Sequence, residues 1–157
     1  MVVFAATDEP LPNVPSENAF LFQAHSLMAG SEPVLRLFTK PHVYDLTSVG
    51  GCGCGFAYGP YDLEVLSETG VPDELKESAK ANHQMSIDSV RLLQDFLRGS
   101  VGSGTVEVYS CWSGDEKDEP ETRIAVSLDH FGGEEFNFVE HQFLVVSEKC
   151  DHETPRK

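Results

Sequence analysis

One helical pattern placed between two groups of extended patterns constrains the fold of this chain more than any other feature. The apolar positions of the helical pattern are Ile87, Val90, Leu93 and Leu97, which share one face of a helix over residues 86–98. Ser86 suits an N-cap, and Gly99 suits the residue that follows a helix end. A helical pattern also follows Pro72, so the sequence leaves open whether the helix extends from residue 73 or breaks in two.

Short extended patterns lie on both sides of this helix. We expect strands at residues 2–6, 19–26, 34–39, 42–46, 106–111, 123–128 and 136–146, the last as one strand or a strand pair. Alternation at 106–111 predicts a half-buried strand. Because the helix stands between runs of strands and does not alternate with them, the chain is predicted to be α+β. Its sheet is predicted to be predominantly antiparallel, with one main helix packed on one face.

The length and composition fit one domain. The chain has 157 residues, of which 40% are hydrophobic and 24% are charged, as in ordinary globular proteins. We expect a single globular domain over residues 1–147, followed by a polar, frayed tail over residues 148–157. A domain of this size buries enough surface to fold without a disulfide or a metal.

The charge of the chain is strongly negative. Eleven Lys and Arg residues stand against 26 Asp and Glu residues, for a net charge of −15. Without a basic stripe, the dominant electrostatic term opposes nucleic-acid binding, and an anionic membrane surface is disfavoured for the same reason. A cationic partner would instead be attracted. The sequence therefore predicts no nucleic-acid or membrane partner and favours a basic protein surface.

The start of the chain predicts a cytoplasmic protein. Residues 1–6 are apolar but lack the basic n-region and the length of a signal peptide. No stretch approaches the roughly 20 apolar residues of a membrane span. In the cytoplasm the four cysteines would be mostly reduced. Nothing in the sequence indicates an oligomeric state.

Residues 50–56, Gly-Gly-Cys-Gly-Cys-Gly-Phe, are the least ordinary segment. Four glycines within six positions allow positive φ angles or a close backbone approach, at Gly50, Gly51, Gly53 and Gly55. We interpret the segment as a tight turn or bulge whose small cysteines pack against the core. An anion-binding concavity of successive N–H groups is an alternative, although no phosphate-binding motif and no nearby lysine accompany it.

Metal or redox chemistry is a further alternative for the two cysteines of this segment. Cys52 and Cys54 could bind a soft metal, with zinc as the candidate and with Cys111, His25 or His42 as further ligands. Their Cys-x-Cys spacing is a poorer match than the usual Cys-x₂₋₄-Cys, and it also differs from the Cys-x-x-Cys of thioredoxin-type motifs. We therefore expect no cofactor.

Aromatic and acidic residues supply the remaining candidates. Phe56, Tyr58 and Tyr61 could line a groove or cover the core, and Trp112 could be a core residue or a partner-facing anchor, with the core favoured. Four acids at residues 115–119 could collect a hard cation. Their order does not match an EF-hand loop and a lysine lies among them, so a solvated charged turn is expected.

The motif search favours a non-catalytic role. The sequence contains no His-Glu-x-x-His, no Gly-x-Ser-x-Gly and no obvious Cys–His pair. We therefore expect a binding module for a basic protein partner, comparable in charge and size with small acidic inhibitor and immunity proteins. The alternatives are a metal or thiol site built on Cys52 and Cys54, or a structural component of a larger assembly.

Overall fold

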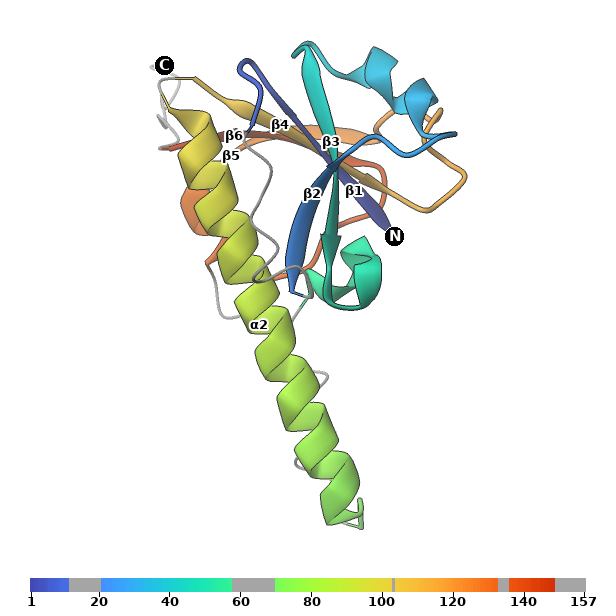
Figure 1. The fold of residues 1–157 in the computed structure, drawn as a ribbon, viewed down its shortest axis with the longest axis vertical. Helices are drawn as coiled ribbons and strands as arrows, with labels where there is room; N and C mark the ends of the chain where they lie inside the picture. The colour runs from blue at the N-terminus through green and yellow to red at the C-terminus, as the bar shows by residue number, and fades with distance from the viewer. Residues whose placement is uncertain (12–20, 58–69, 103, 133–135, 149–157) are drawn as a thin grey trace, which may run out of the picture.

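The structure is a computed structural model that describes residues 1–11, 21–57, 70–102, 104–132 and 136–148. Six strands form one sheet in the order β2-β3-β1-β4-β6-β5 (Figure 1). The strands are β1 (Val2–Thr7), β2 (Phe22–Ser26), β3 (His42–Ser48), β4 (Val106–Cys111), β5 (Thr122–Ser127) and β6 (Gln142–Ser147). Every neighbouring pair is antiparallel except β5 and β6, which are parallel. The predicted α+β class and mostly antiparallel sheet are confirmed.

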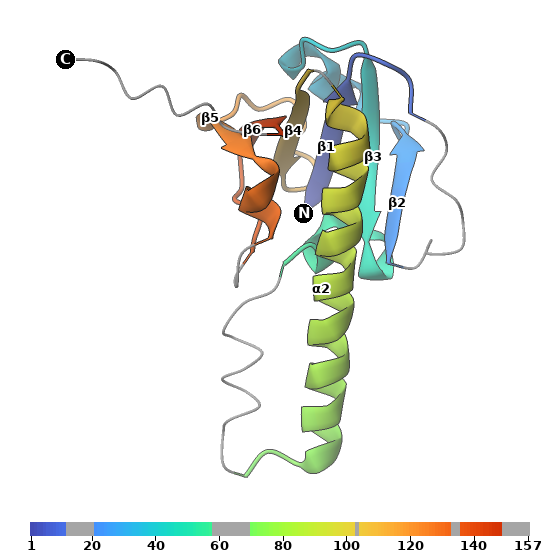
Figure 2. The ribbon, with the colours of Figure 1, turned by 90° about the vertical axis from the view of Figure 1, so that its left-hand side faces the viewer.

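A single helix, α2 (Asp73–Val101), packs against this sheet and settles the question that the sequence left open. Its first turn contains two acids, Asp73 and Glu74. Their negative charges interact favourably with the positive end of the helix dipole and stabilise the helix. Its buried residues all lie in the second half, at Ser89, Val90, Leu93, Leu97 and Val101. That half crosses one face of the sheet, whereas the first half runs past the end of the sheet (Figures 1 and 2).

The main core lies between α2 and the sheet. Because successive residues of a strand point to opposite faces, every second residue of the central strands faces the helix. These residues are Val3, Ala5, Leu46, Val106, Val108, Leu144 and Val146. Leu93 and Leu97 of α2 pack onto them and are fully buried. The helical face predicted from the sequence is therefore the face that holds the fold together.

The opposite face of the sheet is covered by η2 (Glu32–Leu37), a 3₁₀ helix. Val34 and Leu37 of η2 join a second core with Phe4, Tyr109 and Phe143. The strand predicted at residues 34–39 is therefore wrong. Pro33 lies at the start of η2, where it suits a helix but would remove a ladder hydrogen bond from a strand. The three-residue spacing of Val34 and Leu37 matches the period of a 3₁₀ helix.

Two further expectations about strands need correction. All six residues of β4 are buried, not half of them, because α2 and η2 cover both faces of this strand. The last strand begins only at Gln142. Phe136 and Phe138 precede it and reach the main core without belonging to that strand. Residues 19–20 of the expected second strand and residues 149–157 of the expected tail lie outside the described residues.

Among the helices that the structure describes, none combines the length and the apolar run that a crossing of the bilayer requires. The long helix α2 carries charged side chains along its length, including ion pairs from Lys80 to Glu77 and from Arg98 to Asp95. The expected absence of a membrane-spanning helix therefore holds for this part of the chain.

Candidate functional site

The unusual segments of the sequence meet at one end of the sheet. Val2 at the start of β1 pairs with Cys111 at the end of β4, and Ser110 pairs with Gln142 at the start of β6. The loop after Ser48 at the end of β3 lies at the same end, because β3 is antiparallel to β1. We call residues 112–121 and 139–141 at this end the acidic end of the sheet.

The loop after β3 forms two short 3₁₀ turns, η3 (Val49–Gly51) and η4 (Gly53–Gly55). Gly50 and Gly51 have positive φ angles of 80° and 76°, which side chains other than glycine rarely tolerate. A Cβ atom on Gly53 would lie 2.7 Å from Cγ2 of Val3. A Cβ atom on Gly55 would lie 2.5 Å from Oγ of Ser48. Two of the glycines are therefore needed for their dihedral angles and two for close packing.

Cys52 and Cys54 lie side by side in this loop. The Cys54 amide donates to Sγ of Cys52 at 3.2 Å, and the Met1 nitrogen donates to Sγ of Cys54 at 3.2 Å. Burial and the hydrogen bond with Cys54 raise the pKa of Cys52. Burial also opposes ionisation of Cys54, but the hydrogen bond from Cys52 and the Met1 ammonium outweigh it and lower the pKa of Cys54. Cys54 is therefore the cysteine of the pair that ionises more readily.

The further ligands expected for a metal at these cysteines are not brought to them. Cys111 is fully buried in the core beneath η2, and burial, with Glu116 nearby, raises its pKa to about 12. His42 pairs with Thr7 at the far end of β3. His25 is on the edge strand β2, opposite Asp45. Within the described residues, no group of three metal-ligating atoms includes Cys52 or Cys54.

Phe56 is not a partner-facing aromatic. Its side chain is 0% exposed and packs between Phe22 and Phe138, with ring centroids 6.0 and 6.1 Å away. It follows η4 directly, so the glycine-rich loop turns this ring into the core beneath α2. Tyr58 and Tyr61 lie outside the described residues.

Trp112 is exposed, whereas the sequence favoured a core position. It follows the last residue of β4, past the part of the sheet that α2 and η2 cover, and 52% of its surface is accessible. Val139 of the neighbouring segment is also 54% exposed, and its carbonyl accepts a hydrogen bond from Oγ of Ser110 at 2.7 Å. Two large apolar side chains therefore stand in solvent on adjoining segments.

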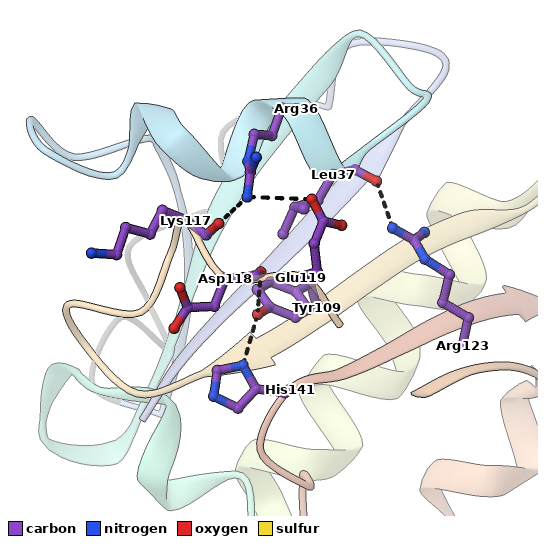
Figure 3. Close-up of polar contacts among 8 residues, drawn as sticks. All are labelled: Arg36, Leu37, Tyr109, Lys117, Asp118, Glu119, Arg123 and His141. Carbon is purple, nitrogen blue, oxygen red and sulfur yellow. Dashed lines mark hydrogen bonds and ion pairs between the residues drawn. The ribbon is translucent and has the colours of Figure 1, made fainter. Parts of the chain in front are cut away.

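The acidic loop beside Trp112 is fastened to the rest of the fold, as Figure 3 shows. Arg36 of η2 forms an ion pair with Glu119 at 3.3 Å and donates to the carbonyl of Lys117. The Tyr109 hydroxyl donates to the carbonyl of Asp118 at 3.1 Å. On β5, Arg123 lies over the ring of Phe143, 4.0 Å from its centroid. The loop is therefore held through the backbone carbonyls of Lys117 and Asp118 and through the Glu119 carboxylate.

At the acidic end, polar side chains from distant segments meet around His141, and no spacing motif in the sequence predicts this group. Nδ1 of His141 lies 3.2 Å from the Tyr109 hydroxyl, and Nε2 lies 3.2 Å from a carboxylate oxygen of Glu140. Ligand atoms of Asp115, Glu140 and His141 all lie within 4.8 Å of one another. Only the pairing of β4 with β6 brings the two segments together, so neither segment taken alone indicates the site.

Comparison with known protein families, with curated proteins and with solved structures finds no significant match for this chain. A functional assignment accordingly rests on the geometry of its own residues.

Proposed function

We propose that this protein is a non-catalytic binding module that docks a basic protein surface at the acidic end of its sheet. The observation that carries the proposal is the exposed ring of Trp112 next to a loop with five carboxylates and one lysine. Tryptophan is one of the residues enriched among those that contribute most to binding at protein interfaces. The surrounding carboxylates favour a positively charged partner.

The physical chemistry of the acidic end suits an arginine-rich partner. A guanidinium over the Trp112 ring would gain about 0.5–2 kcal/mol from the cation–π interaction. The carboxylates around it would mainly raise the association rate and the specificity. Because Arg36 and Tyr109 already hold the loop backbone, little conformational freedom remains to be lost on binding.

Trp112→Ala is expected to weaken binding of an arginine-rich peptide by about 30-fold, equivalent to roughly 2 kcal/mol. The measurement is isothermal titration calorimetry at low and high salt. Affinity for the unaltered chain should fall as salt rises, because exposed charges are screened. Leu75→Ala is the matched control. Leu75 is 59% exposed but lies in the first turns of α2, so its replacement should leave the affinity unchanged.

Since Trp112 is the one tryptophan of the chain, its fluorescence supplies a second readout. Peptide binding at the proposed surface must change the emission of the unaltered protein. Equal affinity of the Trp112→Ala variant, or binding that does not respond to salt, would contradict the proposal.

A second function, a thiol site at Cys52 and Cys54, is favoured by the contact of the two sulfurs and the lowered pKa of Cys54. This function and the binding module are both proposed to act in the cytoplasm, where thiols stay reduced. With a small alkylating reagent near neutral pH, Cys54 should react first and the buried Cys111 last among the three cysteines that the structure describes.

Mass spectrometry of the alkylated peptides checks this order of reaction. Cys54→Ser should remove the fast phase from the peptide that contains residues 52 and 54, while Cys111→Ser, the control, should retain it. Zinc measured in protein purified without chelator tests the metal version of the same site. Equal reactivity of Cys54 and Cys111 together with absence of zinc would reject a thiol function.

A further inference from the structure

The side chains of Asp115, Glu140 and His141 converge from two segments of the acidic end. Their ligand atoms lie within 4.8 Å of one another, although Asp115 and Glu140 are far apart in the sequence. The segments are fixed at this place by the pairing of Ser110 with Gln142 and by the hydrogen bond from Glu121 N to the carbonyl of His141 at 2.8 Å. The convergence is therefore built into the fold.

Hydrogen bonds outside the cluster determine which nitrogen of His141 faces it. The single proton of the Tyr109 hydroxyl goes to the carbonyl of Asp118. A tyrosine hydroxyl keeps its proton at neutral pH, so that proton stays in place. The Tyr109 oxygen must then accept a hydrogen bond from Nδ1 of His141, 3.2 Å away. In the neutral imidazole, Nε2 consequently carries a lone pair.

Within the described part of the chain, this lone pair faces carboxylate oxygens. Nε2 of His141 lies 3.2 Å from a Glu140 oxygen, and the Asp115 carboxylate is within reach of both. Two carboxylates and an imidazole lone pair repel one another until a cation lies between them, either a proton on Nε2 or a metal ion. A histidine ligand whose other nitrogen is oriented by a hydrogen bond is also the usual arrangement around protein-bound metals.

We propose that Asp115, Glu140 and His141 bind a divalent transition-metal ion, with Zn²⁺ as the ion of best fit. One imidazole nitrogen and two carboxylate oxygens are ligands that zinc accepts, and three protein ligands leave a fourth position open for water or a further ligand. Tyr109 acts as a positioning residue that orients the His141 ring. The site lies within the acidic end that also carries Trp112, and it includes neither cysteine of the loop after β3.

The test is Zn²⁺ titration of the full chain carrying Cys52→Ser and Cys54→Ser, which removes thiol binding at the loop after β3. His141→Ala, Asp115→Asn and Glu140→Gln are each expected to weaken zinc binding by at least about tenfold. Tyr109→Phe is expected to weaken it by about 10–100-fold, as loss of an outer hydrogen bond does at metal sites. Circular dichroism confirms that each variant is folded.

Glu121→Gln is the matched control, because it removes the same charge from the same loop without touching the cluster. It should leave the zinc affinity within about twofold of the parent. An equal loss in Glu121→Gln and Asp115→Asn would mean diffuse attraction to acidic groups and would overturn the proposal.

Nitrogen NMR of the His141 ring measures the chemical shifts of Nδ1 and Nε2. A purely structural His141 would show no change in these shifts when zinc is added. Zinc must shift the Nε2 resonance, with Nδ1 still protonated. Zinc binding that leaves His141 Nε2 unshifted, or that persists in His141→Ala, would also overturn the proposal.

Discussion

Phe56→Ala is expected to lower the free energy of unfolding by about 3–5 kcal/mol, the usual cost of removing a fully buried aromatic ring. Phe56 lies at the meeting point of the loop after β3, strand β2 and the segment before β6, in contact with the rings of Phe22 and Phe138. Its removal leaves a cavity in the main core, next to the rings of Phe22 and Phe138. Denaturant unfolding followed by circular dichroism measures the change.

The matched control for Phe56 is Trp112, another aromatic residue that the sequence offered as partner-facing. Because Trp112 is half exposed, Trp112→Ala should change the free energy of unfolding by no more than about 0.5 kcal/mol. The two variants separate a structural role from a binding role. Phe56→Ala should lower the stability of the fold, whereas Trp112→Ala should weaken binding of the basic peptide. A Phe56→Ala protein as stable as the parent would show that the ring does not close the core.

Gly53→Ala is expected to destabilise the fold by about 1–3 kcal/mol, the cost of overpacking a filled interior. The new methyl group would lie 2.7 Å from Cγ2 of Val3 and 3.1 Å from the carbonyl of Met1. Val3 is fully buried in the central strand β1, so it cannot move aside cheaply. The same carbonyl accepts the Gly53 amide at 3.1 Å, and displacement of the loop would break that bond.

Gly99→Ala is the control for this prediction. Gly99 lies inside α2, and among the described residues no atom outside the helix's own backbone lies within 4 Å of the position that a Cβ atom would take. Alanine should therefore stabilise the helix by up to about 1 kcal/mol. Opposite signs for the two glycine replacements, measured as shifts of the melting temperature, are the expected result. Destabilisation of equal size at both positions would argue against a specific clash at Gly53.

The sequence predicted those parts of the fold that local chemistry determines. The apolar positions from Val90 to Leu97 recur with the helical period, and α2 buries them. The alternation over residues 34–39 suggested a strand. There, one proline and a three-residue spacing outweighed the alternation, because η2 covers a face of the sheet that the local pattern does not reveal.

The candidate sites were less predictable, because they depend on contacts between distant segments. Nothing near Trp112 in the sequence shows that Cys111 is the last buried residue of β4 and that Trp112, which follows it, is exposed. Likewise, His141 becomes a candidate ligand only because the strand register places Asp115 and Tyr109 beside it. Glycine content marked the loop after β3 correctly as unusual, but only the fold shows that its aromatic neighbour Phe56 points inward.

The place of β1 in the middle of the sheet has a consequence for how the chain folds during synthesis. Its residues are synthesised before those of β4, yet β4 is one of its two neighbours, with Val2 paired to Cys111. Until β4 has been made, β1 can pair only with β3, and one edge of that unit stays open. Contacts so distant along the chain slow folding, because a long loop must close before they form. From the synthesis of β3 until that of β4, the nascent chain therefore carries an unsatisfied strand edge on β1, the kind of edge that chaperones protect.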